Sequence, residues 1–135
     1  MHAEPSIEIR LLGWSVIVLL AYIVAQAGLA VPERGLSWNA GPRDGWQPPR
    51  GVRAGRAERA LKNFAETYPA FMALALGLMV AGKAGGSGEI GAWLWLTARV
   101  AYLPLYIFGV PWLRSLAYGV SLVGLILMLA RLLGA

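Results

Sequence analysis

The sequence has no cysteine and a single histidine, His2, which lies in the N-terminal tail. A chain without cysteine can form no disulfide and offers no thiolate of its own, and one histidine cannot supply the usual cluster of zinc ligands. Charged residues are also scarce, at 14% of the 135 residues, whereas 58% are hydrophobic. These absences exclude a disulfide-rich domain, a Cys/His metal site and an ordinary soluble domain of this size.

Long apolar runs take the place of the missing polar residues. A helix needs about 20 mostly apolar residues to cross roughly 30 Å of hydrocarbon. Segments of about that length lie at 9–31, 56–82, 90–110 and 113–133, with a Gly-, Pro- and Arg-rich loop at 32–55. The sequence therefore predicts an all-α membrane protein, with one domain over 1–135 that is a bundle of four transmembrane helices.

The basic residues predict the orientation of this bundle. Most of them lie in the long loop and at the start of the helix that follows it: Arg34, Arg43, Arg50, Arg53, Arg56, Arg59 and Lys62. The next loop carries only Lys83. Because basic loops stay on the cytoplasmic side, we expect loop 32–55 in the cytoplasm and both termini across the inner (plasma) membrane. The net charge of +5 is then a topology signal that also suits anionic lipids, and nothing favours a nucleic acid.

Polar side chains recur at helical spacing on three of the expected helices. On the second helix they fall at i, i+3, i+4 and i+7, which puts them on one face: Arg59, Lys62, Asn63 and Glu66. The third and fourth helices add further polar groups: Arg99, Tyr102, Tyr106, Arg114, Ser115 and Tyr118. In the expected topology all of them lie in the cytoplasmic half of the bilayer, so they could converge on one pocket.

Two interpretations of this polar set are open. Ionisable residues inside a membrane are costly, so they tend to face the bundle and to mark function. Alternatively, Glu66 pairs with Arg59 or Arg99 merely to hold the helices together. Glu66 is the only carboxylate well inside an apolar span, which leaves no pair of carboxylates for acid/base catalysis. The other groups are donors that suit an anion, so we expect a cofactor to bring the reactive group, and a thiolate on a small anionic peptide would fit.

Four motifs resemble a known family. "RALKNFAETYPAF" resembles the second-helix signature of the MAPEG family, membrane-associated proteins in eicosanoid and glutathione metabolism. "RVAYLPLYIFG" is similar to its third helix, "RSLAY" to the opening of its fourth, and "GPRD" to a loop of bacterial members. The resemblance covers nearly the whole chain and implies a homotrimer that binds glutathione between neighbouring subunits.

The resemblance also implies roles for individual residues. The cofactor-binding residues would be Arg59, Lys62, Asn63, Glu66, Arg99, Tyr102, Tyr106 and Tyr118. Glu66 would pair with the α-amino group of glutathione and the cationic side chains with its carboxylates. Arg114 would stabilise the thiolate, and Ser115 would donate a second hydrogen bond. The implied function is that of a glutathione transferase or peroxidase acting on a lipophilic electrophile from the bilayer.

The sequence leaves two other functions open. The family includes a protein that binds fatty acid without glutathione chemistry, so a non-catalytic lipid-binding or scaffold protein is the main alternative. A small proton-coupled exporter would also have four short helices. We disfavour it because its acid would be expected in the first helix, and none lies between Leu11 and Val31.

Tryptophan and glycine positions give two expectations about packing. Trp93, Trp95 and Trp112 lie near helix ends, where aromatic side chains anchor a protein at the membrane interface. Gly119 and Gly124 in the fourth helix should permit close contact with another helix.

Overall fold

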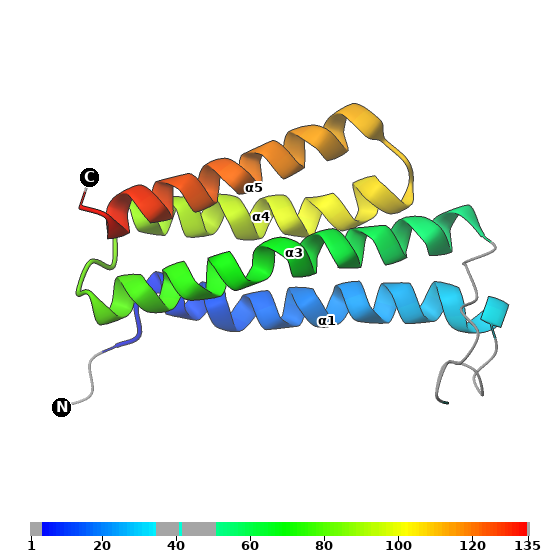
Figure 1. Ribbon diagram of the computed structural model, residues 1–135, viewed down its shortest axis with the longest axis horizontal. Coiled ribbons are helices and arrows are strands. Elements are labelled where there is room, and N and C mark those ends of the chain that lie inside the picture. Colours follow the sequence, from blue (N-terminus) through cyan, green and yellow to red (C-terminus); the bar gives the residue numbers. More distant parts are fainter. Residues whose placement is uncertain (1–3, 35–40, 42–50, 135) are drawn as a thin grey trace.

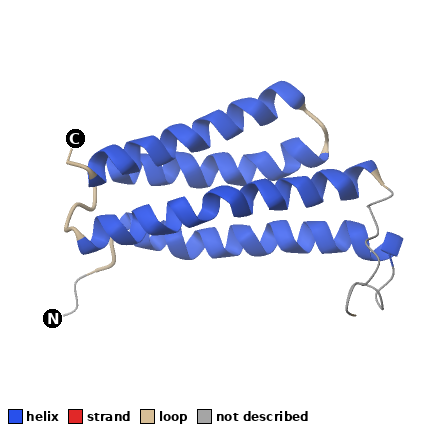
Figure 2. Ribbon diagram, in the orientation of Figure 1, coloured by secondary structure: helices blue, strands red, loops and turns tan. Residues whose placement is uncertain are grey.

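The computed structural model describes residues 4–34, 41 and 51–134, so most of the predicted loop 32–55 lies outside the described residues. The described chain forms four long helices, α1 (Ile7–Arg34), α3 (Val52–Val80), α4 (Ser87–Ile107) and α5 (Pro111–Leu132) (Figure 1). No strand occurs in these residues (Figure 2). The predicted all-α bundle is therefore present, and each helix begins two to four residues before its predicted start.

Glycine and proline explain where the helices end. Gly82 and Gly109 have φ values of 66° and 70°, a left-handed conformation that stops a helix and that glycine adopts without strain. They follow α3 and α4, which therefore end earlier than the apolar runs suggested. Pro111 is the first residue of α5, where its missing N–H leaves no helical hydrogen bond unmade.

The helices form two antiparallel pairs that pack on each other. α1 packs on α3, α4 packs closely on α5, and α3 with α4 joins the two pairs. Within the described ranges the backbones of α1 and α5 do not pack on each other. The loop at 81–86 lies with the start of α1 and the end of α5, and we call this the loop end (Figure 1). The turn at 108–110 lies at the opposite end with the start of α3, and we call this the turn end.

Three of the helices are long and apolar enough to cross a membrane: α1 over Ile7–Pro32, α4 and α5. α3 falls outside this set because polar residues in its N-terminal half lower its hydropathy. Large apolar side chains cover the outer surface, among them Trp14, Val24, Leu116 and Ile126. Such a surface suits contact with lipid.

Aromatic side chains fill the centre of the bundle. Trp95 of α4 is fully buried and stacks on Phe71 of α3, with ring centroids 4.0 Å apart and planes 8° from parallel. Phe64 and Tyr68 of α3 pack against the same indole. The expectation that Trp95 anchors the protein at the interface is therefore wrong, because its position on α4 faces α3. Trp93 and Trp112 are 47% and 86% exposed, as interfacial anchors would be.

α4 and α5 approach closely at two glycines. A Cβ atom on Gly124 would lie 2.5 Å from the backbone oxygen of Gly91, and one on Gly91 would clash with the backbone oxygen of Gly124. The predicted close contact at Gly124 is thus confirmed. The same prediction is wrong for Gly119 within this chain, because a Cβ there would meet nothing within 4 Å.

Candidate functional site

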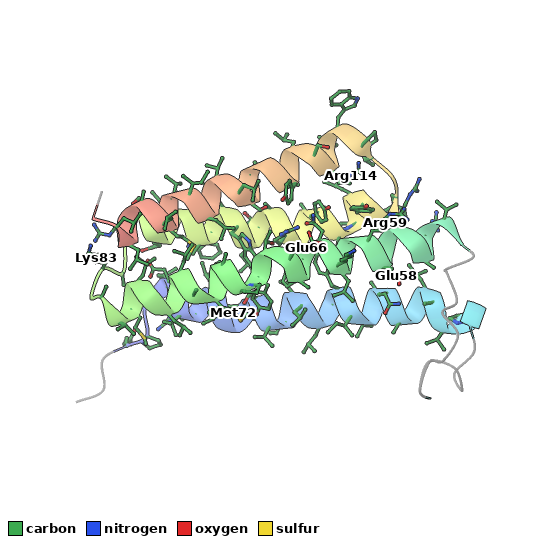
Figure 3. All side chains as sticks on the ribbon, in the orientation of Figure 1. Glu58, Arg59, Glu66, Met72, Lys83 and Arg114 are labelled. Atoms are coloured by element: carbon green, nitrogen blue, oxygen red, sulfur yellow. The ribbon has the colours of Figure 1, made fainter. Side chains whose placement is uncertain are left out.

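At the turn end, Tyr106 of α4 lies between two arginines from different helices. The Arg59 Nε of α3 donates a hydrogen bond to the Tyr106 hydroxyl at 3.2 Å. The Arg114 guanidinium of α5 lies over the Tyr106 ring, 4.7 Å from its centroid. Figure 3 shows Arg59 and Arg114 near the turn end, with Glu66 closer to the middle of the bundle. Three helices therefore contribute polar groups to one place.

Arg99 lies deeper in the bundle and is fully buried. Its Nη1 donates to Asn63 Oδ1 at 2.8 Å and its Nη2 to Thr67 Oγ1 at 2.6 Å. Three aromatic rings surround its guanidinium, with centroids between 4.9 and 5.7 Å away: Phe64, Tyr102 and Tyr118. Arg99 Nε has no hydrogen-bond partner, and no described carboxylate lies within 4 Å. A buried cation is thus held by dipoles and ring faces alone, which leaves the site with net positive charge.

Tyrosines join the two arginine environments. The ring centroid of Tyr102 lies 5.4 Å from that of Tyr106 and 6.4 Å from that of Tyr118. We call the resulting set the arginine–tyrosine cluster: Arg59, Arg99, Tyr102, Tyr106, Arg114 and Tyr118. The sequence placed these residues on three helix faces, and the structure brings them into contact.

Two residues of the predicted site form no ion pair with this cluster. Lys62 and Glu66 are exposed on α3. Neither forms an ion pair within 4 Å to a described residue. The alternative interpretation, in which Glu66 pairs with Arg59 or Arg99 to hold the helices together, is therefore not met in this chain. The buried cation is bonded to Asn63 instead.

Ser115 lies apart from the arginine–tyrosine cluster. It is exposed and lines a groove of about 450 Å³ on the outside of α4 and α5. The other lining residues are apolar or glycine: Leu94, Leu116, Gly119, Val120 and Val123. Its predicted role beside Arg114 stays a prediction.

Sequence reasoning missed three residues that support the site. Thr67 bonds to Arg99, and its i+4 spacing from Asn63 was the available signal. The hydroxyl of Tyr22, the only tyrosine of α1, donates to the Arg99 backbone oxygen at 2.6 Å. Arg56, one turn before Arg59, donates to the Ile107 backbone oxygen at 3.3 Å. Each of them ties a neighbouring helix to α4.

A carboxyl group at the loop end was also missed. Glu8 of α1 is only 1% exposed, and its Oε1 accepts a hydrogen bond from the Gly85 backbone N–H at 2.7 Å. Its Oε2 has no partner. Glu8 is therefore the more buried carboxyl, whereas Glu66 is exposed in the single chain. The position of Glu8 in the first turn of α1 gave no sign that the α3–α4 loop folds over this side chain.

A comparison with protein-family models decides the family. The model of the MAPEG family matches residues 11–134. The chain belongs to the MAPEG family. This membership agrees with the helical bundle and with its membrane-spanning helices, so the chain is a multi-pass membrane protein. The family contains glutathione-dependent enzymes and also non-catalytic members. No curated protein and no solved structure matches the chain.

Proposed function

We propose that this MAPEG protein is a homotrimer that binds glutathione between neighbouring subunits and activates its thiol against a lipophilic electrophile, as a transferase or peroxidase. The observation that carries this proposal is the arginine–tyrosine cluster, beside which Lys62 and Glu66 are exposed on α3. The cluster has an excess of cations, and the exposed positions one and two turns along α3 from Arg59 carry both signs of charge.

The charges of the site match those of glutathione, which has two carboxylates, one ammonium group and a thiol. Glu66 would accept hydrogen bonds from the ammonium group, while Arg59 and Lys62 would pair with the carboxylates. Asn63 is already bonded to Arg99. Its part would therefore be to hold that cation in place, in addition to any contact with the tripeptide.

The bound tripeptide would supply the thiol nucleophile. Arg114 is half-buried and its guanidinium is fixed over the Tyr106 ring, so it would lower the pKa of a thiol placed beside it. The Tyr106 hydroxyl already accepts a hydrogen bond from Arg59, which leaves its own hydrogen free to donate to an anion. Because Ser115 lines the outer groove of α4 and α5, we assign it no contact with this thiolate.

The exposed charges of α3 are the reason for proposing an assembly. A charged side chain facing hydrocarbon costs about 2.5 to 3.5 kcal/mol even on the mild insertion scale. Arg59, Lys62 and Glu66 are all exposed on the same helix in the single chain. A second copy of the chain would cover this face and form the other wall of the glutathione cleft. Native mass spectrometry from lipid nanodiscs should give a trimer, and a stable monomer would overturn the assembly.

The decisive experiment is a glutathione titration of the solubilised protein, followed by the ultraviolet absorbance of the thiolate. The parent should give a saturable thiolate signal near neutral pH. Arg114→Ala should still bind glutathione, yet its bound thiol should titrate like free glutathione. Arg53→Ala is a matched control, because Arg53 is exposed at the turn end and lies over Phe108 instead of Tyr106. Equal thiol pKa values in parent and Arg114→Ala would remove Arg114 from the mechanism.

A non-catalytic lipid-binding role is the second candidate. Two apolar grooves of about 450 and 300 Å³ flank Leu116 and Val120 on α5, and each has the size of an acyl-chain segment. Glutathione binding without a thiolate signal, or no glutathione binding at all, would favour this role.

We also propose that the turn end faces the cytoplasm from the inner membrane. Four described arginines lie there, namely Arg53, Arg56, Arg59 and Arg114, against Arg10, Lys83 and Arg131 at the loop end, and the positive-inside tendency favours the end with more of them. Because the chain has no cysteine, single cysteines at Phe108 and Ala84 can report the two ends separately. Labelling of Ala84→Cys, and not of Phe108→Cys, by an impermeant maleimide on whole cells supports this topology, and the reverse refutes it.

A further inference from the structure

Another arginine of α3, Arg56, lies at the turn end without joining the arginine–tyrosine cluster. Arg56 lies one turn before Arg59, and its Nη1 donates to the backbone oxygen of Ile107 at 3.3 Å. Ile107 is the last residue of α4. The last carbonyls of a helix lack partners within the helix and carry partial negative charge, so a cation is favourable there.

The Arg56 guanidinium occupies space that a glycine leaves open. Gly109 has a φ of 70°, and a Cβ atom on it would lie 2.5 Å from Arg56 Nη1 and 2.6 Å from Cζ. No side chain could be accepted at residue 109 without displacing the guanidinium. Arg56 and Gly109 are more than fifty positions apart in the sequence, yet the guanidinium of one fills the space left by the missing side chain of the other.

The turn held by Arg56 determines where α5 starts. Gly109 N–H donates to the Tyr106 oxygen at 3.1 Å, and Val110 N–H donates to the Leu105 oxygen at 3.0 Å. The next backbone bond runs from Arg114 N–H to the Val110 oxygen at 3.1 Å. Tyr106 and Arg114 therefore lie on the two sides of one short turn, and movement of that turn would change their separation.

We propose that Arg56 is a positioning residue, which fixes the α4–α5 turn through Ile107 and Gly109 and so keeps Arg114 over the Tyr106 ring. The effect of Arg56 on the pKa of a bound thiol rests on the proposed function. Arg53 offers a contrast, because its guanidinium lies 5.2 Å from the centroid of the Phe108 ring and no hydrogen bond joins it to the backbone of the turn. Loss of Arg53 should leave the turn in place.

Hydrogen–deuterium exchange tests the positioning without any ligand. In Arg56→Gln the amides of Gly109 and Val110 should exchange about tenfold faster than in the parent, since the lost hydrogen bond involves a charged group. Arg53→Gln should exchange like the parent, and Arg56→Lys, which keeps a cationic donor, should recover most of the protection. Equal exchange in Arg56→Gln and Arg53→Gln would overturn the proposal.

A thiol titration separates positioning from a merely structural role. In Arg56→Gln the pKa of bound glutathione should move toward that of the free thiol, while binding at low pH, where the thiol is protonated, should change less than threefold by this reasoning. A variant with faster exchange and an unchanged thiol pKa would show that Arg56 stabilises the turn without positioning Arg114. If the parent itself forms no thiolate, the proposed function fails, and the exchange experiment still decides whether Arg56 holds the turn.

Discussion

The close approach of α4 and α5 makes Gly124→Ala a sensitive test of the packing. A Cβ atom at residue 124 would lie 2.5 Å from the Gly91 backbone oxygen and 2.8 Å from the Trp95 backbone nitrogen, whereas ordinary van der Waals contacts lie at 3.4 to 4 Å. Both neighbours are backbone atoms, so no side chain can rotate away. The two helices must separate by roughly 1 Å to admit one methyl group, a case of overpacking.

The expected loss of stability follows from two opposing terms. Overpacking of a well-packed contact costs about 1 to 3 kcal/mol, and the upper part of this range applies because the clash is with backbone. Replacing glycine by alanine within a helix returns about 0.5 to 1 kcal/mol. We therefore expect Gly124→Ala to lower the free energy of unfolding by about 2 kcal/mol. Gly119→Ala meets nothing within 4 Å, so it keeps only the favourable term and should be slightly more stable than the parent.

Reversible unfolding in mixed detergent micelles, followed by helical circular dichroism, measures both variants under the same conditions. Gly119→Ala is the matched control, since it makes the same chemical change in the same helix five residues away. Opposite signs of the change in stability are expected. If both variants unfold at the same denaturant concentration, the close contact between α4 and α5 is not where the structure places it.

Three further predictions test the polar residues. Glu66→Gln should weaken glutathione binding in calorimetry by about ten- to a hundredfold, through loss of a charge-assisted bond, whereas Glu89→Gln should bind like the parent; equal affinities would refute the role of Glu66. Thr67→Val should lower the free energy of unfolding by about 1.5 to 3 kcal/mol, because it removes a hydrogen bond to the buried Arg99. A Thr67→Val protein of parental stability would contradict this. Glu8→Ala should speed amide exchange in the α3–α4 loop and Glu8→Gln should not, because the amide keeps an acceptor oxygen; equal effects would show that the acceptor is unimportant.

The fold could be predicted because long apolar runs mark the helices directly in the sequence. Runs of about 20 apolar residues give the number and order of the helices. α3 and α4 end earlier than predicted because glycine conformation decides where they stop, and the sequence does not reveal which glycines adopt positive φ. Gly82 and Gly109 do so, whereas Gly119 and Gly124 lie inside α5.

The candidate site could be predicted only as a set of helix faces. Spacing placed Asn63 and Glu66 on one face of α3, but it could not say which of them meets Arg99. That choice depends on the rotation of α3 against α4, which is fixed by the stacking of Trp95 on Phe71 deep in the bundle. The same contact explains why Trp95 was wrongly assigned to the membrane interface.

α3 connects the packing of the bundle with the proposed chemistry. Its apolar face, with Phe64 and Phe71, is fully buried against the other helices, and its polar face splits into a bonded part and an exposed part. Asn63 is used within the chain to hold Arg99, whereas Lys62 and Glu66 have no such use. Within a membrane those exposed charges need a polar partner or a cover. A neighbouring subunit with an anionic tripeptide between the two chains would supply both, so the proposed trimer and the proposed glutathione site are two consequences of one exposed helix face.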